Sequence, residues 1–196
     1  MSTLVIHPKD STTTFLKPIY APIPNKTIIN GGVNKTELEQ LIDEHNRIIM
    51  LGHGSPQGLL FVNQFPNVGE YIIDDSMVES ISAKTNNIFI WCHSDQFVRS
   101  NRLNGFCTGM FISEIEEAWY NDFYDVDWDM INESNERFSS IVSKYVNGRL
   151  DVLFKNVIHE YGLLAQSNPI ARFNLERLNF NEIKTDSMVK SNPFPG

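Results

Sequence analysis

Residues 47–54 read Arg47-Ile48-Ile49-Met50-Leu51-Gly52-His53-Gly54. The continuous apolar run that stops at Gly52 is typical of a strand buried on both faces of a parallel sheet. A second run of this kind, Asn87-Ile88-Phe89-Ile90-Trp91, leads directly into Cys92. Because open α/β sheets build their sites just beyond the carboxyl ends of their strands, these two strand ends mark the candidate functional site.

Outward from these runs, short β-branched segments alternate with helical periods, which indicates an α/β sheet with crossover helices. Further main strands are predicted at residues 3–6, 26–30, 108–113 and 172–180, and a small hairpin at residues 59–62 and 71–73. Helices are predicted after an Asn34–Glu37 capping box, after a second capping box at Ser76, and over two apolar periods that stop at Gly148 and Gly162. We expect a mostly parallel sheet flanked by helices, a three-layer sandwich, in one domain over residues 1–190 with a loose tail at 191–196.

Composition narrows the classes of protein and partner. The 196 residues carry 24 acidic and 16 basic side chains, a formal charge of −8, and are 41% hydrophobic, which fits a globular domain rather than a disordered chain. The acidic balance argues against a nucleic-acid partner, which needs clustered Lys and Arg. No apolar run approaches the roughly 20 residues of a membrane span, so no membrane partner is expected.

The N-terminus and the cysteines predict where the protein works. The N-terminal residues lack the basic start and the apolar stretch of a signal peptide. Two cysteines, Cys92 and Cys107, cannot make a disulfide framework. A reducing cytoplasmic setting is therefore expected, with Cys107 as a packed thiol.

His53 and Cys92 are the side chains that carry chemistry. If their strands are neighbours in a right-handed crossover, both side chains emerge at the same edge of the sheet. A thiol and an imidazole are the parts of nucleophilic catalysis, in which the sulfur attacks a carbonyl and the imidazole moves the proton. The glycines that flank His53 would let backbone N–H groups approach a substrate, as an oxyanion hole requires.

The two strand ends resemble the caspase-like cysteine peptidases, the group of caspases, legumain, gingipains, clostripain and separase. The block His53-Gly54-Ser55-Pro56-Gln57-Gly58-Leu59-Leu60 is similar to the His-Gly-Ser-x-Gly-Ile-Leu block of legumain with one residue inserted. Cys92-His93-Ser94-Asp95 is similar to its Cys-x-Ser-Gly block. The motifs cover residues 47–62 and 87–95, and the order of elements extends the similarity to about residue 125.

This resemblance implies a caspase-like fold and a thiol protease, a cysteine endopeptidase that hydrolyses a polypeptide substrate. Cys92 would be the nucleophile and His53 the general acid that protonates the leaving amine. The backbone N–H groups of Gly54 and Cys92 would form the oxyanion hole. The chemistry needs no metal and no cofactor.

The resemblance also implies where the substrate binds. In these folds the loops after the first strand and after the nucleophile build the pocket for the residue before the cut bond. Here those loops place Asp10, Ser94 and Asp95 as substrate-binding residues, and the two carboxylates would favour Lys or Arg over Asp. The alternative is that Asp10 caps the turn after it and Asp95 caps a helix after Cys92, which would leave the pocket neutral.

Two other functions stay open. The family has a small residue before the nucleophile and, in caspases and legumain, a polar one before that, whereas this chain has Trp91 and Ile90. Because of these two residues, the second hypothesis is a catalytically silent caspase-like module that binds another protein. An unrelated α/β ligand-binding domain is the third reading, and it predicts no proximity between His53 and Cys92.

Overall fold

A computed structural model describes residues 1–61 and 70–183, so the expected tail at 191–196 lies outside the described residues. The main sheet has six strands in the order β2-β1-β3-β7-β8-β9. Its first five members in chain order pair in parallel, and β9 pairs antiparallel with β8 at the edge. Their bounds are β1 Thr3–Ile6, β2 Lys26–Ile29, β3 Arg47–Leu51, β7 Ile88–Ile90, β8 Gly105–Thr108 and β9 Leu178–Asn181.

The central strands are apolar throughout because both faces of the sheet are covered. Successive side chains of a strand point to opposite faces. In β3, Ile49 and Leu51 join one hydrophobic cluster, whereas Ile48 and Met50 join another on the opposite face. The expected mostly parallel sheet between two helical layers is therefore confirmed.

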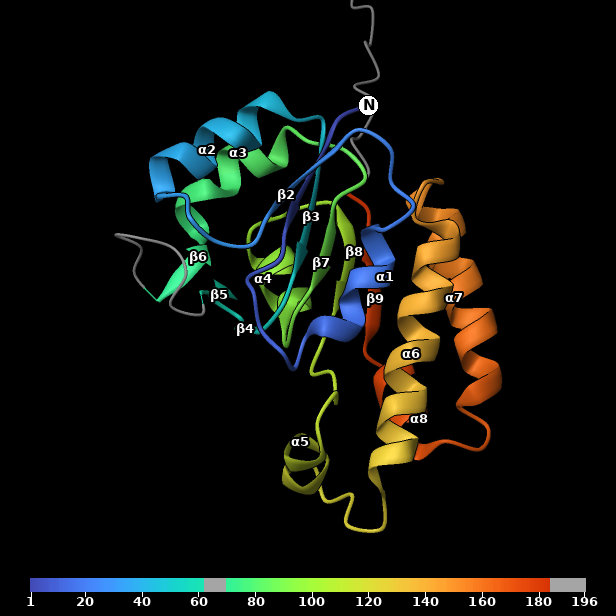
Figure 1. Cartoon of the computed structure of the whole chain (residues 1–196). Coiled ribbons are helices and arrows are strands. Elements are labelled where there is room, and N and C mark those ends of the chain that lie inside the picture. The colour runs from blue at the N-terminus through green and yellow to red at the C-terminus, as the bar shows by residue number, and fades with distance from the viewer. Residues whose placement is uncertain (62–69, 184–196) are drawn as a thin grey trace, which may run out of the picture.

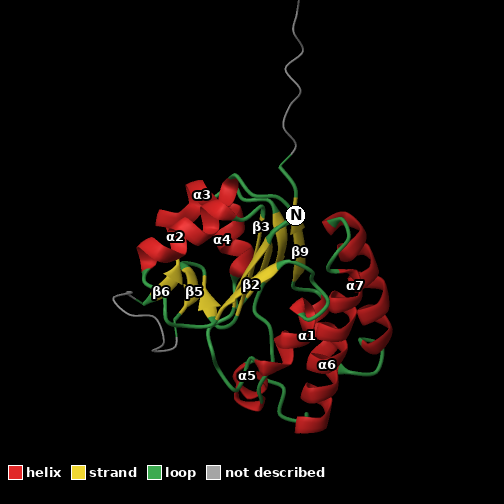
Figure 2. Cartoon of the chain, turned by 45° about the horizontal axis from the view of Figure 1, so that its top comes forward, coloured by secondary structure: helices red, strands yellow, loops and turns green. Residues whose placement is uncertain are grey.

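The helices divide between the two faces, as Figures 1 and 2 show. The helices α2, α3 and α4 cover one face, and α1, α6 and α7 cover the other. Helix α8 lies beside α6 and α7, and α5 is set apart near the N-terminal end of α6. Their bounds are α1 Lys17–Tyr20, α2 Lys35–Glu44, α3 Val78–Ser82, α4 Ser94–Ser100, α5 Ile115–Tyr120, α6 Trp128–Tyr145, α7 Leu150–Leu164 and α8 Pro169–Leu175. Among the described residues, no helix combines the length and apolar character that crossing a bilayer requires.

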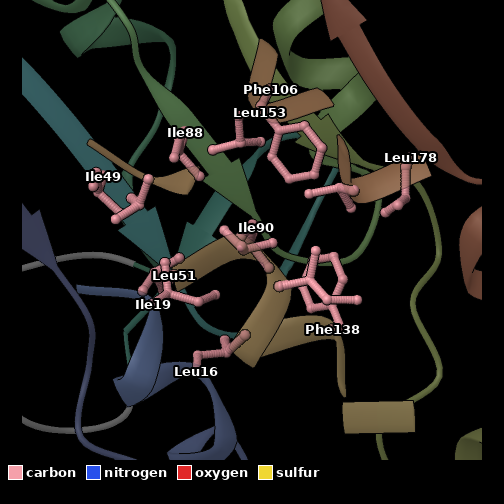
Figure 3. Packing of buried hydrophobic residues seen from close by; sticks show 14 of the residues in the cluster. Leu16, Ile19, Ile49, Leu51, Ile88, Ile90, Phe106, Phe138, Leu153 and Leu178 are labelled. Carbon is pink, nitrogen blue, oxygen red and sulfur yellow. The ribbon is translucent and has the colours of Figure 1, made fainter. Parts of the chain in front are cut away.

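The larger core lies between the sheet and α6 and α7 (Figure 3). Ile49, Ile88 and Phe106 project from three neighbouring strands toward Leu153 of α7, and Ile90 lies near Phe138 of α6. Ile90 is 3% exposed. The residue two before Cys92 is thus apolar because it belongs to this core.

The predicted small hairpin forms a second sheet. Strands β4 (Gly54–Ser55), β5 (Gly58–Leu60) and β6 (Tyr71–Ile73) pair antiparallel in that order, and the predicted end of the hairpin at Val62 lies outside the described residues. The Asn34–Glu37 capping box before α2 is confirmed. The predicted capping box at Ser76 is wrong, because Asp74 instead caps a 3₁₀ turn at Asp75–Met77 by accepting from the Ser76 N–H.

Three other local predictions are wrong. The strand expected over 108–113 is β8, which ends at Thr108 because the chain bends at residues 109–110 and the Ile112 N–H then donates to the Asn174 side chain at 2.7 Å. The first part of the strand expected over 172–180 is the end of helix α8, which Asn168 caps and Pro169 begins, and only residues 178–180 lie in β9. Gly162 lies inside α7 rather than ending it.

Candidate active site

The strand order has its topological switch point between β1 and β3. The chain passes from β1 to β2 on one side and continues through β3, β7 and β8 on the other. Loops at the carboxyl ends of the strands diverge there and leave a crevice, which is where ligands bind in open α/β sheets. The loop after β1 holds Asp10 and Thr12, and the loop after β3 holds His53.

His53 and Cys92 line the same small pocket at this crevice, so the structure brings the two predicted catalytic side chains together. Strands β3 and β7 are parallel neighbours, and the Gly52 N–H donates to the Ile90 carbonyl at 3.0 Å, which holds the two strand ends side by side. The cavity volume is about 20 Å³, close to the space of one water. The other lining residues come from the loops after β1 and β8 and from the strand ends: Thr13, Phe15, Leu16, Gly52, Ile90, Trp91, Phe111 and Ser113.

The His53 imidazole is held by Thr12 and Asp10. The Thr12 hydroxyl donates to Asp10 Oδ1 at 2.7 Å, and His53 Nε2 lies 2.7 Å from the same hydroxyl oxygen and 4.0 Å from Asp10 Oδ2. The hydrogen bond from the Thr12 hydroxyl lowers the pKa of Asp10, so this carboxylate is an acceptor at neutral pH. The hydroxyl has one proton, which it gives to Asp10, and it therefore accepts from His53 Nε2–H. In neutral His53 this leaves Nδ1 as the proton acceptor.

The Cys92 thiol is protonated in the free protein. Burial, with a smaller contribution from the negative charge of Glu117, raises the pKa of Cys92 to about 11. The S–H group donates to the Phe111 carbonyl oxygen, 3.7 Å from the sulfur. Cys92 is therefore a neutral thiol unless a base takes its proton.

The Trp91 indole packs in the core and explains why residue 54 is glycine. The indole is 1% exposed, packs against Phe89 and Phe97, and donates from Nε1 to the Ser55 carbonyl at 3.0 Å. A Cβ atom at Gly54 would lie 2.0 Å from Trp91 Cδ1. The bulky Trp91 side chain thus fills the core beneath the β4 strand. Residue 54 must be small because the indole packs directly against it.

The structure does not place Ser94 or Asp95 where a substrate would contact them. Ser94 is fully buried, and its hydroxyl accepts from the Thr108 N–H at 2.9 Å and lies 2.8 Å from the Phe89 carbonyl oxygen, which ties α4 to the sheet. Asp95 is 8% exposed in the first turn of α4 and forms an ion pair with Arg99. The helix that the alternative expects after Cys92 is present as α4, but its N-cap residue is His93 rather than Asp95.

Asp10 lies at the edge of the site and has a contact with the Thr12 hydroxyl that the sequence did not suggest. It accepts from the Thr12 N–H at 2.8 Å, as the turn-capping alternative expects, and also from the Thr12 hydroxyl. The contact between Thr12 and His53 was missed, since no local pattern indicates a contact with a residue 41 positions away. Ser113 and Phe111 were missed because the strand before them was predicted too late in the chain.

Two further predictions concern the surroundings of the site. Cys107 is a buried free thiol in β8, as expected. His93 lies immediately before α4 with a left-handed backbone at φ of +67°, so the chain turns into the helix directly after Cys92. The oxyanion role of the Gly54 and Cys92 N–H groups stays a prediction.

Nothing in the described part of the chain brings three His, Cys, Asp or Glu side chains together as a metal site. No protein-family model matches the chain, and a search of curated proteins finds no significant match. The functional assignment therefore depends on the geometry of the pocket that His53 and Cys92 share.

Proposed function

We propose that this chain is a cysteine endopeptidase of the caspase-like type, with Cys92 as nucleophile and His53 as general acid and base. The observation that carries the proposal is the shared pocket at the switch point of the sheet. The strand order β2-β1-β3-β7-β8-β9, with the histidine after β3 and the cysteine after β7, supports the same family. Two free cysteines fit a reducing compartment, and we place the protein in the cytoplasm.

The proposed reaction begins with proton transfer from the Cys92 thiol to His53 Nδ1 as the sulfur bonds to the substrate carbonyl carbon. His53 then gives this proton to the amine nitrogen, the C–N bond breaks, and a thioester remains on Cys92. Water, deprotonated by His53, attacks the thioester and releases the carboxylic acid and the thiol. The N–H groups of Gly54 and Cys92 would stabilise the oxyanion in both halves.

In this mechanism Thr12 is a positioning residue. Its hydroxyl binds Nε2–H of His53 and fixes the tautomer in which Nδ1 accepts the thiol proton. The ionised Asp10 carboxylate stabilises the imidazolium that forms in the first step, 4.0 Å from Nε2. The arrangement of carboxylate, hydroxyl and imidazole supplies orientation and charge without a metal ligand set.

A second function, a catalytically silent binding module, is favoured by one observation. The Cys92 thiol is partly buried, its pKa is raised to about 11, and its pocket of about 20 Å³ is too small for a peptide side chain. A peptidase must open this pocket when substrate binds. A silent module has no need to open it.

Cleavage of a mixed library of internally quenched peptides distinguishes the two functions. The proposal expects cleavage by the full chain and by Cys107→Ala, a matched removal of the other thiol. Cys92→Ala and His53→Ala should abolish cleavage while thermal unfolding stays cooperative. Lack of cleavage by the wild-type chain, or cleavage that survives Cys92→Ala, would overturn the peptidase proposal.

A further inference from the structure

Four large aromatic side chains are exposed within ten residues of each other. Trp119 and Tyr120 end α5, Tyr124 lies in the loop after it, and Trp128 begins α6, with exposed fractions of 48%, 86%, 68% and 51%. Scattered exposed apolar residues are ordinary, but these four are all the strongly exposed aromatic residues in the described part of the chain. We refer to them as the aromatic surface.

The fold does not need these rings for its own core. The same segment has a separate hydrophobic cluster, in which the buried Ile115, Ala118 and Ile131 pack with the partly buried Phe123 and Val126. These side chains hold α5 and the loop against α6 and α8. The rings of the aromatic surface alternate with them and face solvent, so they are available to a partner.

The charge around the aromatic surface selects the partner. Residues 103–136 contain nine carboxylates and no Lys, Arg or His. The two arginines of α8 and the turn after it are engaged, since Arg172 donates to the Ala165 and Gln166 carbonyls and Arg177 lies over the Phe173 ring and pairs with Glu176. Exposed Trp and Tyr faces among carboxylates favour Lys and Arg side chains through cation–π and ionic attraction together.

This segment is continuous with the candidate active site. Phe111 and Ser113 line the pocket of Cys92, and α5 begins two residues after Ser113. At its start the Glu117 carboxylate accepts from Ser113 and Glu114 N–H groups. The segment that carries the aromatic surface therefore begins at the lining of the pocket.

We propose that the aromatic surface binds a Lys- or Arg-rich polypeptide segment and presents such chains to the His53–Cys92 pocket. The binding step stands on the aromatic surface and its charge, whereas the presentation step rests on the proposed peptidase function. The partner is defined by its positive charge and unfolded backbone, and the attraction weakens as salt screens it.

Binding of labelled twelve-residue peptides to the full chain tests the first step. An alternating Lys-Gly peptide should bind, and the matched Glu-Gly peptide should not. Replacing Trp119 and Trp128 by Ala should weaken binding about 5- to 30-fold, since each exposed cation–π contact contributes modestly. The charge variant Glu116→Gln, Asp122→Asn, Asp125→Asn should weaken it on the order of tenfold at low salt.

The control variant removes three exposed carboxylates from α2 and α3, on the far side of the sheet: Asp43→Asn, Glu44→Gln and Glu79→Gln. It should bind the Lys-Gly peptide like the wild type. Equal binding of both peptides, unchanged binding by the tryptophan variant, or equal loss in the control would overturn the docking proposal. If docking is found but no peptide is cleaved, the peptidase proposal fails and the docking proposal stands.

Discussion

Replacing Gly54 by Ala tests the packing of the site most sharply. The added Cβ would lie 2.0 Å from Trp91 Cδ1 and 2.5 Å from the Gly58 carbonyl oxygen, both far inside van der Waals contact. The indole cannot swing away because it is 1% exposed and its N–H is bound to the Ser55 carbonyl. Overpacking of this kind typically costs about 1–3 kcal/mol.

For a chain of this length, that loss lowers Tm by about 2–12 °C and lowers the urea midpoint with an unchanged m-value. Gly162→Ala is the matched control, since its Cβ would meet nothing closer than Leu175 Cδ2 at 3.7 Å and it lies inside α7. This control should gain about 0.5–1 kcal/mol of stability from helix propensity. Wild-type stability in Gly54→Ala would refute the packing argument.

Three other predictions concern the candidate site and the residues around it. The buried His7 has its ring nitrogens 3.2 Å from the Tyr20 hydroxyl and 3.1 Å from the Thr13 hydroxyl, and burial lowers its pKa to about 4. The stability that neutral His7 contributes is therefore complete above pH 6.5 and is lost as the pH falls through 4; His7→Gln should remove up to about 3 kcal/mol of this pH dependence, measured by urea titration at each pH. Thr12→Val should reduce kcat for peptide cleavage about 10- to 100-fold with little change in KM, and Thr12→Ser should restore it, because the hydroxyl orients His53. Glu117→Gln should lower the pKa of Cys92 from about 11, measured as the midpoint of iodoacetamide reactivity against pH, and an unchanged midpoint would rule out the electrostatic contribution.

The sequence predicted the centre of the fold well. Strands β1 and β3 and the start of α2 were placed correctly because burial on both faces and a capping box are local signals. The predictions failed where a distant contact decides the structure. Strand β8 ends at Thr108, and the chain after it bends so that Ile112 binds the Asn174 side chain; no pattern near Thr108 indicates that bond.

In the candidate site, too, local signals were read correctly and distant contacts were missed. His53 and Cys92 were found because they follow recognisable buried strands. Asp95 was expected in the pocket because it follows the nucleophile, but the left-handed residue before α4 turns the chain into a helix and buries it against Arg99. Thr12 joins the site only through the folded arrangement of β1 and β3.

The central claim is that Cys92 reacts with a carbonyl substrate through His53. Treatment of the native full chain with a peptidyl acyloxymethyl ketone, followed by peptide mapping in a mass spectrometer, measures this directly. If Cys92 is the nucleophile, one label is expected, on Cys92, with Cys107 unmodified and labelling lost in His53→Ala. An unlabelled Cys92 in the wild-type chain, or labelling that proceeds at the wild-type rate in His53→Ala, would contradict it.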